Sequence, residues 1–177
     1  SAGAAHLDNV SPAIFGGFTV THCENPVKVS RFDSPKDLEC LVLLPDKQKT
    51  STKEARRILP DGVPRSCANK NLSSFATLLC GLAKQDSGLV IEGLEDCIVE
   101  PARCKAGFIA GVRELKRVAK SFGFGACASG AGPALIAFGK SSNSRKAEFE
   151  KQARKVFEKI GLAVEARWTK ASRQGAA

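Results

Sequence analysis

The sequence contains no apolar run of membrane-spanning length, and no basic N-terminal segment followed by an apolar one. We therefore expect a soluble, cytoplasmic protein that has no membrane partner. Tyrosine is absent and tryptophan occurs once, whereas the ten phenylalanines stand mostly at the periodic positions typical of a core. Proteins that bind single-stranded nucleic acid interleave basic residues with stacking aromatic rings. Despite a net charge of +9, nucleic acid is therefore not the partner that we expect.

Cysteine pairs of the Cys-x-x-Cys type are also missing. The seven cysteines are an odd number at scattered spacings, and several stand inside apolar periodic segments. This pattern favours reduced, buried thiols over disulfides or a zinc site. Methionine is absent as well, and the first residue is Ser1. Loss of an initiating methionine and a longer parent protein both explain such a start.

The residues that are present describe an ordinary globular protein. A chain of 177 residues, 43% of them hydrophobic, can bury a core of its own. Apolar runs predict strands at 17–21, 27–32, 38–44, 124–128, 134–138 and 162–168. Apolar stripes and caps predict helices at 12–15, 52–59, 69–83, 88–98, 108–122 and 149–160. This order predicts an α+β fold, with helices packed on one face of antiparallel sheets.

Several details of this prediction are specific. The continuous apolar run 38–44 should be a central strand, and 100–103 should be a break between two helices. Lys116 and its basic neighbours should be solvated, and the tail 169–177 should be frayed. One helical stripe should face the core, and it consists of Leu72, Phe75, Ala76, Leu79 and Ala83.

A glycine-rich run at 123–133 lies between a predicted helix and a predicted strand. Glycine lets the backbone turn sharply and approach a ligand closely, and successive free N–H groups can bind an anion. A phosphate loop and a tight hairpin turn both fit this run.

Three other segments of the sequence contain candidate binding residues. His6-Leu7-Asp8-Asn9 is dense in hydrogen-bonding groups, although a turn closed by an Asn or Asp side chain explains it equally. The segments 52–56 and 100–103 each end in an arginine. An arginine beside a strand end suits a carboxylate, but a solvated surface charge is the alternative.

In their order and spacing these four segments resemble the homoserine kinases, which belong to the GHMP family of small-molecule kinases. The loop Ser-Gly-Ala-Gly-Pro, at 129–133, is shared across GHMP kinases, and the other three segments resemble the homoserine members. The resemblance extends from Gly3 to about Ala176. It implies a GHMP-kinase-like fold, in which 1–62 end an S5-like N-terminal domain and 63–177 form the C-terminal GHMP domain.

The resemblance implies transfer of the ATP γ-phosphoryl group, with Mg²⁺, to the hydroxyl of L-homoserine, giving O-phospho-L-homoserine in threonine biosynthesis. His6 and Asn9 match substrate-contacting residues. Arg56 and Arg103 match arginines that hold the amino-acid carboxylate and neighbouring groups. Asp8 stands where other GHMP kinases carry an acidic catalytic residue, and a turn or cap residue is the alternative. The loop that lines the site near the phosphates is matched by Ser129, Gly130, Ala131 and Gly132.

One family element is absent from the sequence. GHMP kinases carry an upstream loop of the type Pro-x-x-x-Gly-Leu-Gly-Ser-Ser-Ala, which opens a helix whose N-terminus binds the ATP phosphates. No such stretch occurs here, and the Mg²⁺ ligands belong to the same missing part, so we expect no metal ligand in this chain. We expect the C-terminal portion of a kinase, inactive alone and prone to self-associate, with a homodimer as the candidate assembly.

Two other functions are alternatives to this one. Another GHMP kinase, acting on mevalonate or a sugar, would not need the two arginines that suit an amino-acid carboxylate. A basic nucleic-acid-binding α+β module would use the net charge and two basic helical stripes, but no known module signature occurs. These stripes are Arg113, Lys116 and Lys120, and Arg154, Lys155 and Lys159.

Overall fold

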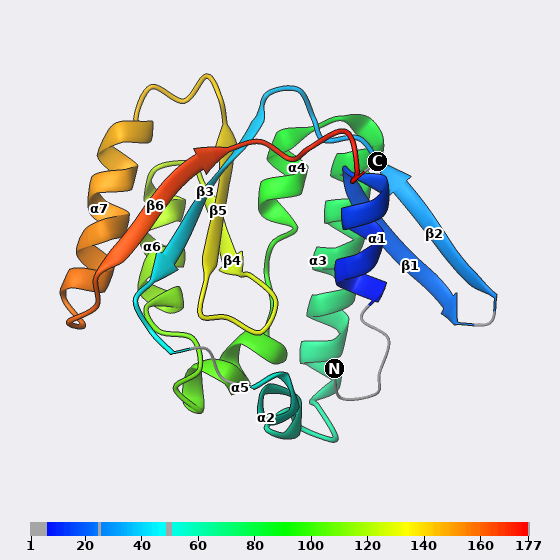
Figure 1. Cartoon of the computed structure of the whole chain (residues 1–177), viewed down its shortest axis with the longest axis horizontal. Coiled ribbons are helices and arrows are strands. Elements are labelled where there is room, and N and C mark those ends of the chain that lie inside the picture. Colours follow the sequence, from blue (N-terminus) through cyan, green and yellow to red (C-terminus); the bar gives the residue numbers. More distant parts are fainter. Residues whose placement is uncertain (1–6, 25, 49–50, 177) are drawn as a thin grey trace.

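A computed structural model describes residues 7–24, 26–48 and 51–176 (Figure 1). Its helices are α1 (Leu7–Phe15), α2 (Thr52–Arg57), α3 (Arg65–Lys84), α4 (Ser87–Glu92), α5 (Val99–Lys105), α6 (Val112–Ser121) and α7 (Lys146–Glu158). Its strands are β1 (Phe18–Glu24), β2 (Val27–Phe32), β3 (Leu38–Pro45), β4 (Gly125–Ala128), β5 (Leu135–Lys140) and β6 (Val164–Thr169). Among these described elements, no helix combines the length and apolarity needed to cross a membrane.

The main sheet has the order β4-β5-β3-β6, and every neighbouring pair is antiparallel. The prediction that β3 is a central strand is confirmed. Leu41 pairs with Ala137 of β5 and with Trp168 of β6, so hydrogen-bonded neighbours flank it on both sides. Its side chain is fully buried, as is that of Leu43. Because strand side chains alternate between faces, both leucines point into the same core.

Helices α6 and α7 cover one face of this sheet (Figure 1), which confirms the predicted α+β arrangement. Their predicted stripes point inward, since Leu115 and Phe149 are fully buried. The Phe149 ring stacks on Phe124 with 4.4 Å between ring centroids and meets Trp168 edge-on. On the opposite face Leu44 stays 50% exposed. The main core therefore lies between the sheet and these two helices.

The stripe predicted for α3 does not face the core, and this prediction was wrong. Leu72 is 67% exposed and Phe75 is 48% exposed, whereas Leu82 is buried. The helix carries apolar residues on more than one side, so the helical period alone did not identify the packed side. It begins at Arg65, earlier than the predicted start at 69.

Helices α3 and α4 pack together through two glycines. A Cβ at Gly81 would lie 2.5 Å from the backbone nitrogen of Val90, and one at Gly93 would lie 2.5 Å from that of Leu78. Only glycine permits so close an approach of two backbones. Gly93 also follows the last residue of α4, so the helix predicted at 88–98 is six residues long and ends at Glu92.

The hairpin β1–β2 forms a separate two-stranded sheet beside α1 (Figure 1). Helix α1 begins at Leu7 rather than at the predicted position 12. Ser11 is buried and its hydroxyl lies 3.0 Å from that of Thr21. The C-terminal tail returns to this unit and is not frayed, because the N–H of Ala176 donates to the carbonyl of Ala13.

The division of the chain after residue 62 stays a prediction. Strand β3 precedes that boundary, yet it pairs with β5 and β6, which follow it.

Six of the seven cysteines have described side chains, and all six are free thiols. Most are buried or half-buried as predicted, although Cys80 is exposed. Burial raises the pKa of Cys127 to about 12, so its thiolate is scarce at neutral pH.

Candidate active site

The segment 100–103 lies inside helix α5, so the prediction of a break there was wrong. Pro101 is tolerated because the first helical turn has no intrahelical acceptors for its N–H groups. Asp96 supplies acceptors for that turn. Its carboxylate accepts from the N–H of Ile98 at 2.8 Å and from that of Glu100 at 2.8 Å. The hydrogen bonds to the Asp96 carboxylate therefore explain how α5 can begin two residues before Pro101.

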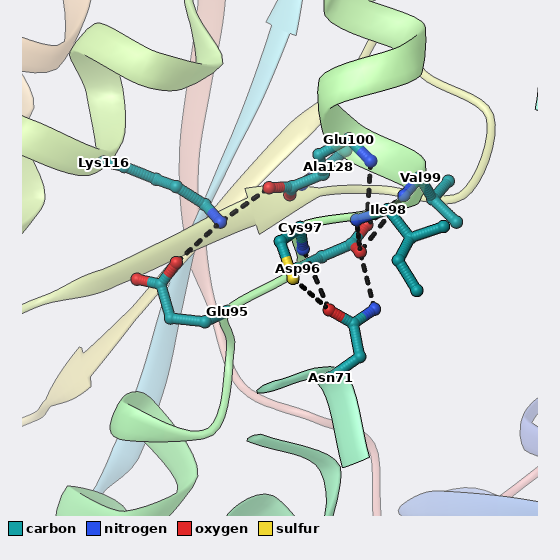
Figure 2. A network of polar contacts seen from close by, with 9 residues as sticks. All are labelled: Asn71, Glu95, Asp96, Cys97, Ile98, Val99, Glu100, Lys116 and Ala128. Carbon is teal, nitrogen blue, oxygen red and sulfur yellow. Dashed lines mark hydrogen bonds and ion pairs between the residues drawn. The ribbon is translucent and has the colours of Figure 1, made fainter. Parts of the chain in front are cut away.

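Asn71 connects this cap to α3 (Figure 2). Its amide nitrogen donates to Asp96 at 2.8 Å, and its amide oxygen accepts from the N–H of Cys97 at 2.9 Å. Burial alone would raise the pKa of Asp96, but the Asn71 amide and the backbone N–H groups of Ile98, Glu100 and Val99 outweigh it. The pKa of Asp96 therefore lies below its usual value of 3.8.

Replacing Asp96 with alanine should lower the free energy of unfolding by about 1–2 kcal/mol at pH 7, the range of a lost helix cap. Because folding depresses the pKa, the ionised carboxylate stabilises the fold above the unfolded-state value. That contribution disappears as the pH falls through the folded-state value. Urea denaturation of both proteins between pH 7 and pH 3 measures it. The control is Asp61→Ala, which removes an exposed carboxylate. If the loss of unfolding free energy in Asp96→Ala were the same at pH 3 as at pH 7, the assignment of Asp96 as an ionised cap would be contradicted.

Glu100 is buried and holds the end of strand β4 (Figure 2). One carboxylate oxygen accepts from the backbone N–H of Ala128 at 2.6 Å. The other lies 2.6 Å from the ammonium of Lys116, which also approaches Glu95 at 3.5 Å. Burial alone would lower the pKa of Lys116, but the two carboxylates outweigh it and raise this pKa. The prediction that Lys116 is solvated was therefore wrong.

Arg103 lies one turn further along α5 and holds the glycine loop itself. Its Nη1 donates to the carbonyl of Gly130 at 2.5 Å. Its Nε is buried and has no hydrogen-bond partner among the described residues. A guanidinium carries five N–H donors, so most of them are not used by the loop contact.

The glycine loop joins β4 to β5 and has two residues in the left-handed region. Gly130 has a φ of 54° and Gly132 a φ of 82°. A Cβ at Gly132 would lie 2.4 Å from Ile109, whereas one at Gly130 would meet nothing within 4 Å. Within the described part of the chain, the N–H groups of Gly130 and Ala131 donate no hydrogen bond. Free N–H groups beside open space suit a phosphate.

The predicted residues on α1 and α2 are placed as follows. Asp8 and Asn9 are exposed in the first turn of α1, where the Asn9 amide donates to Asp8 at 3.4 Å. Arg56 is exposed in the last turn of α2, beside the buried Ala55. His6 lies outside the described residues. The described contacts join Arg103 to the loop, but they do not join Asp8 or Asn9 to it.

Sequence reasoning missed three members of this site: Asn71, Asp96 and Lys116. An aspartate shortly before a helix is a known capping signal, so Asp96 could have been found once the helix at 99–105 was recognised. No local pattern identifies Lys116, because its partner Glu100 is sixteen residues away. In the described residues, no cluster of three or more His, Cys, Asp or Glu side chains could hold a metal ion.

Comparison with known proteins bears on this arrangement. Residues 78–159 match the family described as GHMP kinases C terminal. The homoserine kinase of Methanococcus maripaludis is 42% identical over 144 residues, which are 81% of this chain and 46% of the relative. That of Pyrococcus abyssi is 34% identical over 174 residues, 98% of this chain and 56% of the relative.

A solved structure agrees with these sequence relatives. The homoserine kinase from Cytophaga hutchinsonii superposes with a TM-score of 0.85 at 32% identity, covering 98% of this chain and 54% of that one. The chain therefore spans about half the length of the relatives that it matches. These similarities confirm the resemblance inferred from the four motifs.

Proposed function

Since this chain contains a GHMP kinase C-terminal domain and is homologous to about half of each homoserine kinase relative, we propose that it is one part of a homoserine kinase. The complete enzyme would transfer a phosphoryl group from ATP to the hydroxyl of L-homoserine. It would act in the cytoplasm, in threonine biosynthesis. The observation that carries this proposal is the geometry of the glycine loop. Arg103 of α5 donates a hydrogen bond to the carbonyl of Gly130, while the N–H groups of Gly130 and Ala131 donate none to the described residues.

The loop is the proposed contact for the phosphates of ATP. The N–H groups of Gly130 and Ala131 have no acceptor among the described residues, and the space beside Gly130 is open. Such N–H groups favour a bound anion without a charged side chain. Mg²⁺, when bound, would neutralise charge on the phosphates, and we propose no ligand for it in this chain.

Arg103 is the proposed carboxylate-binding residue, together with Arg56. A homoserine carboxylate presents two oxygens, which a guanidinium can bind through two parallel hydrogen bonds. We further propose that His6 and Asn9 contact homoserine and that Asp8 is the acidic residue near its hydroxyl. Phosphoryl transfer depends mainly on positioning and charge stabilisation, so these residues would orient the hydroxyl toward the γ-phosphate.

A chimaera tests the proposal. The 174 aligned residues of the Pyrococcus abyssi homoserine kinase are replaced by this chain, and ADP production is measured with ATP, Mg²⁺ and L-homoserine. We expect turnover with homoserine and none with mevalonate. The isolated chain should be inactive, since its sequence lacks the family's main phosphate loop.

The control is a chimaera whose circular dichroism and size-exclusion profile match those of the parent enzyme. A folded chimaera without homoserine-dependent turnover would contradict the proposed substrate. Turnover by the isolated chain would contradict the assignment of the main ATP contacts to another part of the enzyme.

A further inference from the structure

We propose that Glu100 is a positioning residue for the glycine loop, and that the buried ion pair with Lys116 maintains it in that role. The contacts stand on their own, whereas the consequence for phosphate binding rests on the function proposed above. Glu100 does not contact the proposed ligand-binding N–H groups. It acts two residues before Gly130, at Ala128, which is the last residue of β4 and directly precedes the loop.

The first step is the free edge of the sheet. Strand β4 is the outer strand, so its N–H groups alternate between β5 and the open side. The N–H of Ser129 donates to Ala134 on the β5 side. The N–H of Ala128 points the other way and donates to Glu100 at 2.6 Å. Glu100 thereby fixes the backbone on the side of β4 where the described residues place no strand.

The second step is the charge. The Glu100 side chain is only 9% exposed, and that of Lys116 is 19% exposed. A buried carboxylate is costly unless a counter-charge and hydrogen bonds accompany it. Lys116 lies 2.6 Å from the second oxygen and supplies that counter-charge. Helix α6 therefore contributes to the position of the loop through the ion pair between Lys116 and Glu100.

The third step is the pairing of Glu100 with Arg103. Residues three apart on a helix lie on one side of it. Glu100 holds the residue before the loop, and Arg103 holds Gly130 within it. Two contacts from one short helix restrain both the entry and the middle of the loop. The Asp96 cap then determines where that helix begins.

The test uses Glu100→Gln, Glu100→Ala and Lys116→Met. Glutamine keeps an acceptor for Ala128 but loses the charge, so it separates the ion pair from the hydrogen bond. The matched control is Glu114→Gln, which removes the exposed ion pair with Arg117 on the same α6. Amide hydrogen exchange is measured in this chain for residues 128–132 and, as a reference, for the amides of β5.

We expect exchange of the Ala128 amide to accelerate by about tenfold in Glu100→Gln, and more in Glu100→Ala, because a charge-assisted bond is weakened or lost. The β5 amides and the Glu114→Gln control should not change. Unchanged exchange at 128–132 in both Glu100 variants would overturn the proposal. Equal acceleration in β5 would assign Glu100 a role in general stability and overturn it too.

The second readout uses the active chimaera. Glu100→Gln should raise the KM for ATP about tenfold and change the KM for homoserine less than about threefold, since its effect reaches the phosphate loop first. Equal changes in both constants would overturn the link to phosphate. If the chimaera itself is inactive, the proposed function fails, and the exchange measurement still decides whether Glu100 positions the loop. If Glu100→Ala does not fold, Lys116→Met takes its place, because it removes the ion pair from the side of Lys116.

Discussion

Arg103→Ala in the active chimaera should lower kcat/KM for homoserine by about 100-fold, within the range of a lost charge-assisted bond to a charged group. Most of this loss should appear as a raised KM for homoserine, and the KM for ATP should rise by a much smaller factor, through loss of the contact with the Gly130 carbonyl. Arg103 uses one donor on Gly130 and has further donors for a carboxylate. Steady-state kinetics with each substrate varied in turn measures both constants.

Two further variants sharpen this result. Arg103→Lys should recover only part of the activity, because an ammonium has the charge but not the planar fork of a guanidinium. Arg117→Ala is the matched control, since Arg117 is a largely exposed arginine on α6 and should be silent. An unchanged KM for homoserine in Arg103→Ala would contradict the carboxylate role. Together with Glu100→Gln, the experiment separates two residues of α5, because the KM for ATP should rise most in Glu100→Gln and the KM for homoserine most in Arg103→Ala.

Phe149→Ala in this chain should lower the free energy of unfolding by about 3–5 kcal/mol, as expected for truncation of a buried aromatic ring. Phe149 has no exposed surface, and its ring stacks on Phe124 and meets Trp168. Truncation would leave a cavity between α7 and the sheet, where close packing allows little collapse. Urea denaturation followed by tryptophan fluorescence measures the change, since Trp168 is the only tryptophan.

Phe75→Ala is the matched control for this experiment. It removes the same ring from α3, but that ring is 48% exposed. The loss should stay below about 1 kcal/mol, as for most surface substitutions. Similar losses at the two positions would mean that the core does not lie between the sheet and α7.

Local pattern predicted the elements of the main core. The continuous run at 38–44 is the central strand β3, whereas β2, which matches the strand predicted at 27–32 residue for residue, belongs to the separate hairpin. The stripes of α6 and α7 point inward as predicted. In α6 and α7 one side is polar, so the helical period leaves a single choice of buried face.

Prediction was less successful where two faces or distant residues compete. Leu72 and Phe75 fit a core stripe by spacing, but α3 packs on α4 through Gly81 and Leu82 instead. Proline at 101 suggested a break, yet the carboxylate of Asp96 satisfies the first turn of α5. Lys116 resembled a surface charge because its carboxylate partner lies on another helix.

The sequence by itself determined the family, because four short motifs in order need no coordinates to be recognised. The roles of His6, Asp8, Asn9 and Arg56 stay predictions. Tertiary structure alone decided how the glycine loop is held, through Glu100 on its preceding strand and Arg103 on its carbonyl. The physical reason is that a buried charge is stable only beside its counter-charge and hydrogen-bond partners, and folding brings these from α3, α5, α6 and β4.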